Sequence, residues 1–227
     1  MTQITKDMML FFACFAPILC GVFIKFAIPL AEKYLSEHFG VSQILVPYYL
    51  IFDLFLALIT PLMFCFISAM VILGEIDDNI SNYMAVTPLG SKGYLLSRLG
   101  FPIVISFIIT ILLLSIFPLT QIALYTQIGV SLLVSGLGFI VSLLIVSISA
   151  NKVEGMAVSK LSGLFMIGIP APFFITSNVQ YILWILPSFW LAKFALENSP
   201  LYFIFGIITS IIWILLLIKK FVKKIVL

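Results

Sequence analysis

Apolar residues run through this chain in long stretches that are separated by short polar segments. Five of these stretches are long, covering residues 8–30, 46–74, 99–124, 128–150 and 200–218. A helix that crosses a bilayer needs about 20 apolar residues, because each residue adds about 1.5 Å along its axis. The pattern therefore predicts five spanning helices. We expect the first to be retained, because the apolar part of a cleavable signal is only about 7–15 residues long.

A sixth apolar stretch, residues 161–176, is barely long enough to cross the hydrocarbon layer. Pro170 and Pro172 lie near its end and should break its helix there. Another apolar piece follows and contains Pro187. We interpret residues 177–199 as a re-entrant hairpin of short helices, because irregular backbone at membrane depth must be surrounded by protein or water. The alternative is seven plain spans, which would place the two chain ends on opposite sides.

Basic residues divide unequally between the two sides of the predicted bundle. With six spans and the N-terminus inside, nine Lys and Arg residues fall in inner segments, two fall in outer segments, and Lys25 lies within the first span. Short cytoplasmic loops are enriched in Lys and Arg. We therefore expect an all-α integral membrane protein whose single transmembrane domain, residues 1–227, has six spans and both termini in the cytoplasm.

The composition agrees with a membrane protein and excludes other classes. Of the 227 residues, 63% are hydrophobic and 9% are charged, and the mean hydropathy is +1.28. A soluble domain carries about 25% charged residues, and a disordered chain has the opposite bias. The net charge of +3 and the absence of a basic stripe argue against nucleic-acid binding. Three cysteines in apolar stretches and a single histidine indicate no disulfide framework and no metal site.

Small residues gather in the fourth predicted span. Ser131, Ser135, Gly136 and Gly138 form a patch there. Small side chains let helix backbones approach closely in membranes, so the patch predicts tight packing against another span.

Two inner loops are polar enough to dock a cytosolic partner. They comprise residues 75–98 and residues 151–160. The first loop opens with an acidic run that ends at Asp78, and Asp78 or Asn79 can cap a short helix. A turn is then predicted at Thr87-Pro88-Leu89-Gly90.

These loops resemble those of the type-2 family of ABC exporter permeases. The resemblance rests on the acidic run, on Thr87-Pro88-Leu89, on Tyr94 and Arg98 leading into the third span, on Asn151–Gly155, and on Leu186–Trp190 before the last span. It implies six spans, a re-entrant hairpin that includes Pro170, Pro172, Pro187 and Trp190, and a permease subunit that exports a hydrophobic or amphipathic drug, peptide or lipid.

The resemblance also implies partners. The chain lacks the G-x-x-x-x-G-K-[ST] phosphate loop, so two cytosolic ABC ATPase subunits would carry ATP and magnesium, and a second permease chain, a copy or a paralogue, would complete the exporter. No catalytic, cofactor or metal site is expected on this chain. The residues expected to contact the ATPase are Asp77, Asp78, Asn79, Tyr83, Thr87, Pro88, Lys152 and Glu154. The alternative is that the first loop is only a solvated connector.

Two ionisable residues lie inside predicted spans, and such residues are costly enough to suggest a role. Lys25 and Asp53 fall at similar depths in antiparallel spans. We expect them to pair or to share a polar pocket. The alternative is that each reaches the membrane surface separately.

The sequence leaves three other function classes open. An intramembrane enzyme lacks acid–base and metal groups at membrane depth, and a secondary transporter or channel would have only Asp53 as a buried carboxylate. A membrane immunity or assembly protein without transport activity is harder to separate from a permease. In each case we expect a multi-pass protein of a bacterial cell membrane.

Overall fold

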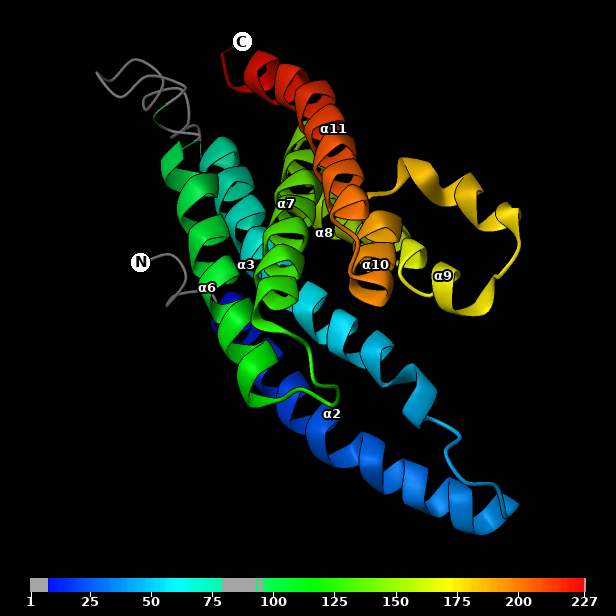
Figure 1. Ribbon diagram of the computed structural model, residues 1–227. Helices are drawn as coiled ribbons and strands as arrows, with labels where there is room; N and C mark the ends of the chain where they lie inside the picture. Colours follow the sequence, from blue (N-terminus) through cyan, green and yellow to red (C-terminus); the bar gives the residue numbers. More distant parts are fainter. Residues whose placement is uncertain (1–7, 79–92, 94–95, 227) are drawn as a thin grey trace.

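The chain folds as a bundle of helices, shown in Figure 1. The structure is a computed structural model that describes residues 8–78, 93 and 96–226. The α-helices are α2 (Met8–Phe39), α3 (Tyr49–Asp77), α6 (Phe101–Ile116), α7 (Leu124–Ile148), α8 (Lys152–Leu161), α9 (Ala171–Phe174), α10 (Pro187–Glu197) and α11 (Pro200–Val226). Shorter helical turns are η1 (Val46–Tyr48), η2 (Leu96–Gly100), η3 (Ser162–Gly168) and η4 (Asn178–Ile185). No strand occurs in these described ranges.

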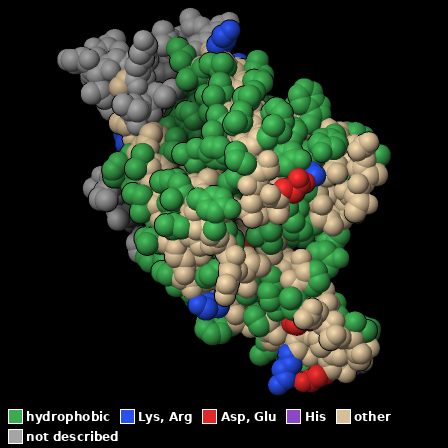
Figure 2. Space-filling model, viewed as in Figure 1, with side chains coloured by type: hydrophobic (Ala, Val, Ile, Leu, Met, Phe, Trp, Pro, Cys, Tyr) green, Lys and Arg blue, Asp and Glu red, His purple; other side chains and the backbone are tan. Residues whose placement is uncertain are grey.

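Six helical stretches are long and apolar enough to cross a membrane. They are Cys14–Phe39, Val46–Asp77, Ser97–Ile116, Leu124–Ile148, Lys152–Phe174 and Pro200–Val222. Apolar side chains cover much of the visible face in Figure 2, as expected of a surface that contacts lipid. The predicted all-α architecture with six spans is therefore confirmed.

Helices α3 and α7 form the centre of the bundle. In each of them 72% of the most apolar 18-residue stretch is buried inside the protein, whereas the buried share is 28% or less in the other four spanning stretches. The two helices pack against each other more extensively than any other pair, and α2, α6 and α11 lie around them (Figure 1). The outer helices expose their apolar residues because the bilayer is their solvent.

A close approach between α3 and α7 occurs at the predicted patch of small residues. A Cβ added to Gly138 would lie 2.8 Å from the carbonyl oxygen of Pro61 in α3. Ser131 and Ser135 are buried on the same helix. The expectation of tight packing is confirmed at Gly138, where only a residue without a side chain fits.

Helix α2 is longer than the predicted span of residues 8–30. It continues to Phe39, and the turn that follows is tied back by Glu32. The backbone N–H groups of Ile44 and Leu45 both donate to the Glu32 carboxylate, with an N···O distance of 2.8 Å for Ile44. The apolar pattern missed this extension because polar residues after Leu30 interrupt it.

The prediction of a loop over residues 151–160 is wrong, because helix α8 occupies residues Lys152–Leu161. The Asn151 side chain accepts a hydrogen bond from the backbone N–H of Glu154 at 2.9 Å, and the Glu154 carboxylate accepts one from the backbone N–H of Ala150 at 2.6 Å. This arrangement is a variant of the capping box, because its second N–H belongs to the residue before the N-cap, and it satisfies free N–H groups around the helix start. Polar residues that suggested a loop are thus the N-terminal cap of the fifth spanning stretch.

The segment predicted as a hairpin folds back along α11. The indole N–H of Trp213, near the middle of α11, donates to the carbonyl of Ile185 at 2.9 Å. From there α10 runs to Asn198, whose side-chain oxygen accepts a hydrogen bond from the Thr126 hydroxyl at the start of α7. These are contacts that a re-entrant hairpin would make. Its placement inside the membrane stays a prediction, as does the side on which the termini lie.

Gly138→Ala should destabilise the bundle by about 1–3 kcal/mol, the usual penalty for overpacking a core. The added methyl group would collide with the backbone of Pro61, which cannot rotate away. Thermal unfolding of the purified protein in detergent micelles measures the effect. The matched control is Gly136→Ala, because an added Cβ there would have no neighbour closer than 3.8 Å. Equal melting temperatures for the two variants would contradict the close contact.

Candidate functional site at the basic end of the bundle

One end of the bundle collects the residues for which a partner contact was predicted. Helices α3, α7 and α11 finish there, and η2 and α8 begin there. We call it the basic end, because it carries Arg98, Lys152, Lys219, Lys220 and Lys224. Of the predicted coupling residues, Asp77, Asp78, Lys152 and Glu154 are described, whereas Asn79, Tyr83, Thr87 and Pro88 lie outside the described residues.

Asp77 joins the end of α3 to the start of α8. The backbone N–H of Lys152 donates to its carboxylate at an N···O distance of 3.0 Å. A carboxylate at a helix N-terminus accepts from free N–H groups and is attracted by the positive end of the helix dipole. Asp77 therefore fixes α8 directly to the helix that leads into the first polar loop. Asp78, the next residue, caps α3 through its backbone N–H.

Gly155 brings α8 close to α3. A Cβ at this position would lie 2.3 Å from the Leu73 side chain and 3.0 Å from the Met70 side chain. Four of the five residues from Asn151 to Gly155 thus contribute to the junction. Asn151 and Glu154 cap the start of α8, and the backbone of Lys152 bonds Asp77. Gly155 allows the close contact with α3. The sequence predicted a polar connector here and missed that its residues set the junction of two helices.

Lys224 closes the same end from α11. Its ammonium donates to the carbonyl oxygens of Val146, at 2.7 Å, and of Ser149. These carbonyls lie at the end of α7, where a cation is favoured by the helix dipole. Burial lowers the pKa of Lys224, while the charges of Glu154 and Asp77 act in the opposite direction.

The sequence indicated Lys224 only as a basic residue of the inner side and did not predict this contact. The spacing of Lys224 from Leu217 and Phe221 could have indicated that its side chain faces the bundle. Both of these residues are buried, and residues spaced by three or four share one face of a helix.

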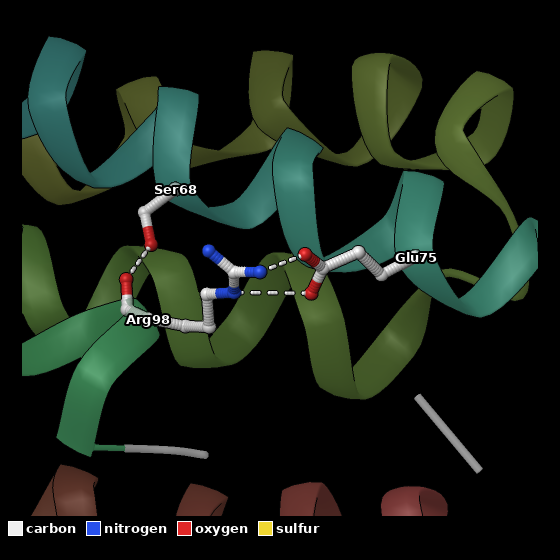
Figure 3. A network of polar contacts seen from close by, with 3 residues as sticks. All are labelled: Ser68, Glu75 and Arg98. Carbon is white, nitrogen blue, oxygen red and sulfur yellow. Dashed lines mark hydrogen bonds and ion pairs between the residues drawn. The ribbon is translucent and has the colours of Figure 1, made fainter. Parts of the chain in front are cut away.

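Glu75 and Arg98 form an ion pair that brackets the first polar loop, as Figure 3 shows. The Arg98 Nε donates to Glu75 Oε2 at 3.1 Å, and its Nη2 donates to Oε1. The Ser68 hydroxyl donates to the Arg98 carbonyl. Glu75 is 2% exposed, so the two-pronged pairing with a guanidinium compensates a charge that would otherwise be costly to bury. Both ends of the loop over residues 75–98 are thereby fixed to α3.

Lys25 and Asp53 do not form the predicted ion pair within the described part of the chain. The Asp53 carboxylate is fully buried and accepts from the backbone N–H groups of Leu119 and Thr120, both at 2.9 Å, and from the Thr120 hydroxyl. Lys25 donates to the carbonyl of Ile116. The two side chains bond different groups of the same turn between α6 and α7, because its backbone N–H groups satisfy the carboxylate without a cation.

The hairpin residues hold short helices rather than one continuous helix. Pro170 precedes α9, Pro172 lies in its first turn, and Pro187 begins α10. Trp190, the fourth residue named for the predicted hairpin, is 7% exposed. Its indole N–H donates to the carbonyl of Trp184 at 2.7 Å, so it serves as a buried link within the segment.

Known proteins resemble this chain along most of its length. The family described as "Fluoroquinolones export permease protein Rv2686c-like" matches residues 1–218. The chain belongs to this family. Fluoroquinolones export permease proteins of two Mycobacterium tuberculosis strains, Rv2686c of H37Rv and MT2760 of CDC 1551, are each 27% identical over 191 residues. The matched region covers 83% of this chain and 75% of those proteins. No solved structure matches.

Membership settles the class of this protein. It is a multi-pass protein of the cell membrane and a permease of an exporter, as the resemblance to the type-2 ABC permeases predicted. The family favours a transport component over an enzyme or an assembly protein. In this permease the basic end joins the end of α3 to the start of α8, and the end of α11 to the end of α7, next to the first polar loop.

Asp77→Ala should loosen the start of α8 in the permease. Loss of a capping carboxylate destabilises a helix by about 0.5–2 kcal/mol, so amide hydrogen exchange at residues 152–155 should accelerate several-fold. Asp78→Ala is the matched control, because it removes the same charge one residue further along. If Asp78→Ala accelerates exchange in α8 as much as Asp77→Ala does, the capping bond is not what holds the helix.

Proposed function

We propose that this chain is the membrane subunit of an ATP-driven exporter. It would work with two cytosolic ABC ATPase subunits, which bind ATP and magnesium, and with a second permease chain, either a copy or a paralogue. The chain itself would carry out no catalysis. The names of its relatives make fluoroquinolones, or aromatic amphiphiles of that kind, the first cargo to test.

The observation that carries the proposal is the way the first polar loop is anchored. The ion pair between Glu75 and Arg98 fixes both ends of residues 75–98 to α3. Asp77 continues this anchor into α8. A partner that pulled on the loop would therefore move the end of the central helix α3 and the start of the fifth spanning stretch together. That coupling suits a subunit that converts motion of an ATPase into motion of its spans.

The remaining spans offer features that fit an exporter whose energy comes from elsewhere. The buried carboxylate Asp53 is bonded by backbone N–H groups and the Thr120 hydroxyl, so it has a structural role in the connection between α6 and α7. The proline-interrupted segment 169–199 lies against α11 and α7. We propose that it is the re-entrant hairpin near the outer surface, with both chain termini in the cytoplasm.

The test is to introduce charge where the ATPase is expected to bind. Tyr83→Asp combined with Thr87→Asp should leave the permease inserted in the membrane and still able to pack, because these residues lie between the anchored ends. In the reconstituted complex, cargo should no longer stimulate ATP hydrolysis, and transport should fall at least tenfold.

The control is Val41→Asp combined with Ser42→Asp, which adds the same charges at exposed positions between α2 and η1, outside the spanning stretches. It should keep both cargo-stimulated hydrolysis and transport. Unchanged transport in the Tyr83 and Thr87 variant would refute the docking role of the loop.

A further inference from the structure

A cavity of about 450 Å³ opens between α2, α3 and the start of α6. Its walls are mainly apolar side chains from two antiparallel helices. They are Phe64, Ile67 and Val71 from α3 and Phe101, Pro102 and Ile105 from α6. Ligand pockets in proteins commonly have volumes of about 300–1,000 Å³ and are lined by apolar residues with a few polar groups. The cavity is therefore large enough to hold part of an amphiphilic molecule.

The polar groups of this cavity lie at one end of it. Ser68, Ser97 and Arg98 line the side nearest the basic end. Ser97 is the first residue of the third spanning stretch, so this side lies where the membrane surface is expected. Ile105 lies eight residues further along, or about 12 Å deeper along a helix. A molecule in the cavity would place its polar end near Arg98 and its apolar part among the deeper side chains.

Arg98 can bond such a polar end without leaving Glu75. A guanidinium carries five N–H donors in a rigid fork, and Glu75 uses one on Nε and one on Nη2. Nη1 makes no hydrogen bond to the described residues, and Figure 3 shows it pointing away from the Glu75 carboxylate. Glu75 does not line the cavity within the described part of the chain. The ion pair thus holds the guanidinium in place and, among the described residues, leaves Nη1 for another acceptor.

We propose that this cavity binds an anionic phospholipid, with the phosphate at Arg98 and an acyl chain between α3 and α6. Arginine forms strong, charge-assisted bonds with phosphate oxygens. Basic pockets between spanning helices at the cytoplasmic surface are typical sites for anionic lipid head groups. The proposal does not depend on ATP-driven transport.

The lipid would bear on the anchoring of the first polar loop. Arg98 is the residue through which the start of α6 is joined to α3, and the cavity fills the space between these helices beside that pair. A bound phosphate would hold the guanidinium from its second side. A lipid bound in the cavity would therefore stabilise the Glu75–Arg98 ion pair, which holds the two ends of residues 75–98 together.

Native mass spectrometry of the purified permease tests the proposal with dioleoyl phosphatidylglycerol and dioleoyl phosphatidylcholine as probes. The unaltered chain should retain at least tenfold more phosphatidylglycerol than phosphatidylcholine. Ile105→Trp, which fills the cavity, should reduce the phosphatidylglycerol adduct at least tenfold. Val104→Trp is the matched control. Val104 directly precedes Ile105 in α6, is 58% exposed and does not line the cavity. It should leave the adduct unchanged.

Three outcomes would overturn the lipid assignment. The first is an equal phosphatidylglycerol adduct in the Ile105→Trp and Val104→Trp variants, and the second is equal retention of the two lipids by the unaltered chain. The third is binding of the free aryl carboxylate 1-pyrenebutyrate without any binding of phosphatidylglycerol. The last result would assign the cavity to a soluble amphiphile instead. If Ile105→Trp does not elute as a single species, Val71→Phe fills the cavity from the α3 wall, and the same outcomes decide.

Discussion

Polar groups that are buried among apolar helices must find their hydrogen-bond partners inside the protein, and this requirement shapes the whole bundle. Water is excluded from the interior, and the hydrocarbon of the bilayer offers neither donors nor acceptors. Asp53 illustrates the consequence, because its carboxylate is satisfied by the turn between α6 and α7. Glu75 is satisfied by Arg98, and the last carbonyls of α7 are satisfied by Lys224. Each of these bonds joins elements that are distant in sequence.

These bonds connect helix ends, whereas the apolar contacts position helix sides. The packing of α3 on α7 at Gly138 and Pro61 determines how closely the central helices approach. The polar bonds then determine which ends move together. At the basic end, Asp77, Arg98 and Lys224 link α3 with α8, α3 with α6, and α11 with α7 through separate contacts. In the exporter that we propose, this division would let a force applied at the surface reach the spans without separating them.

The sequence was a good guide to the spans and a poor guide to their ends. Long apolar stretches predicted six spanning helices, because burial in lipid requires apolar side chains all along a helix. The same reasoning predicted a loop where α8 lies, because Asn151, Lys152 and Glu154 are polar for the sake of capping a helix. The pairing of Glu75 with Arg98 was not predicted either. Partners separated by 23 positions leave no periodic signal, and only the folded chain brings them together.

The ion pair expected between Lys25 and Asp53 was wrong for a related reason, although both side chains bond groups of the connection between α6 and α7. Opposite charges at similar depth suggested an ion pair, but backbone N–H groups at a helix connection can serve a carboxylate equally well. Composition cannot distinguish a cation from a well-placed turn. By contrast, the family resemblance drawn from short motifs was confirmed by the match of residues 1–218 to a family of export permeases.

ATP hydrolysis by a partner is the energy source that we propose for this permease. Uptake of the proposed cargo into inverted membrane vesicles that contain the permease and its ATPase tests this source most directly, with ATP and ion gradients controlled separately. ATP-driven export predicts uptake that requires ATP and continues when ionophores have collapsed the ion gradients. Uptake that proceeds without ATP and stops when the gradients are collapsed would contradict it.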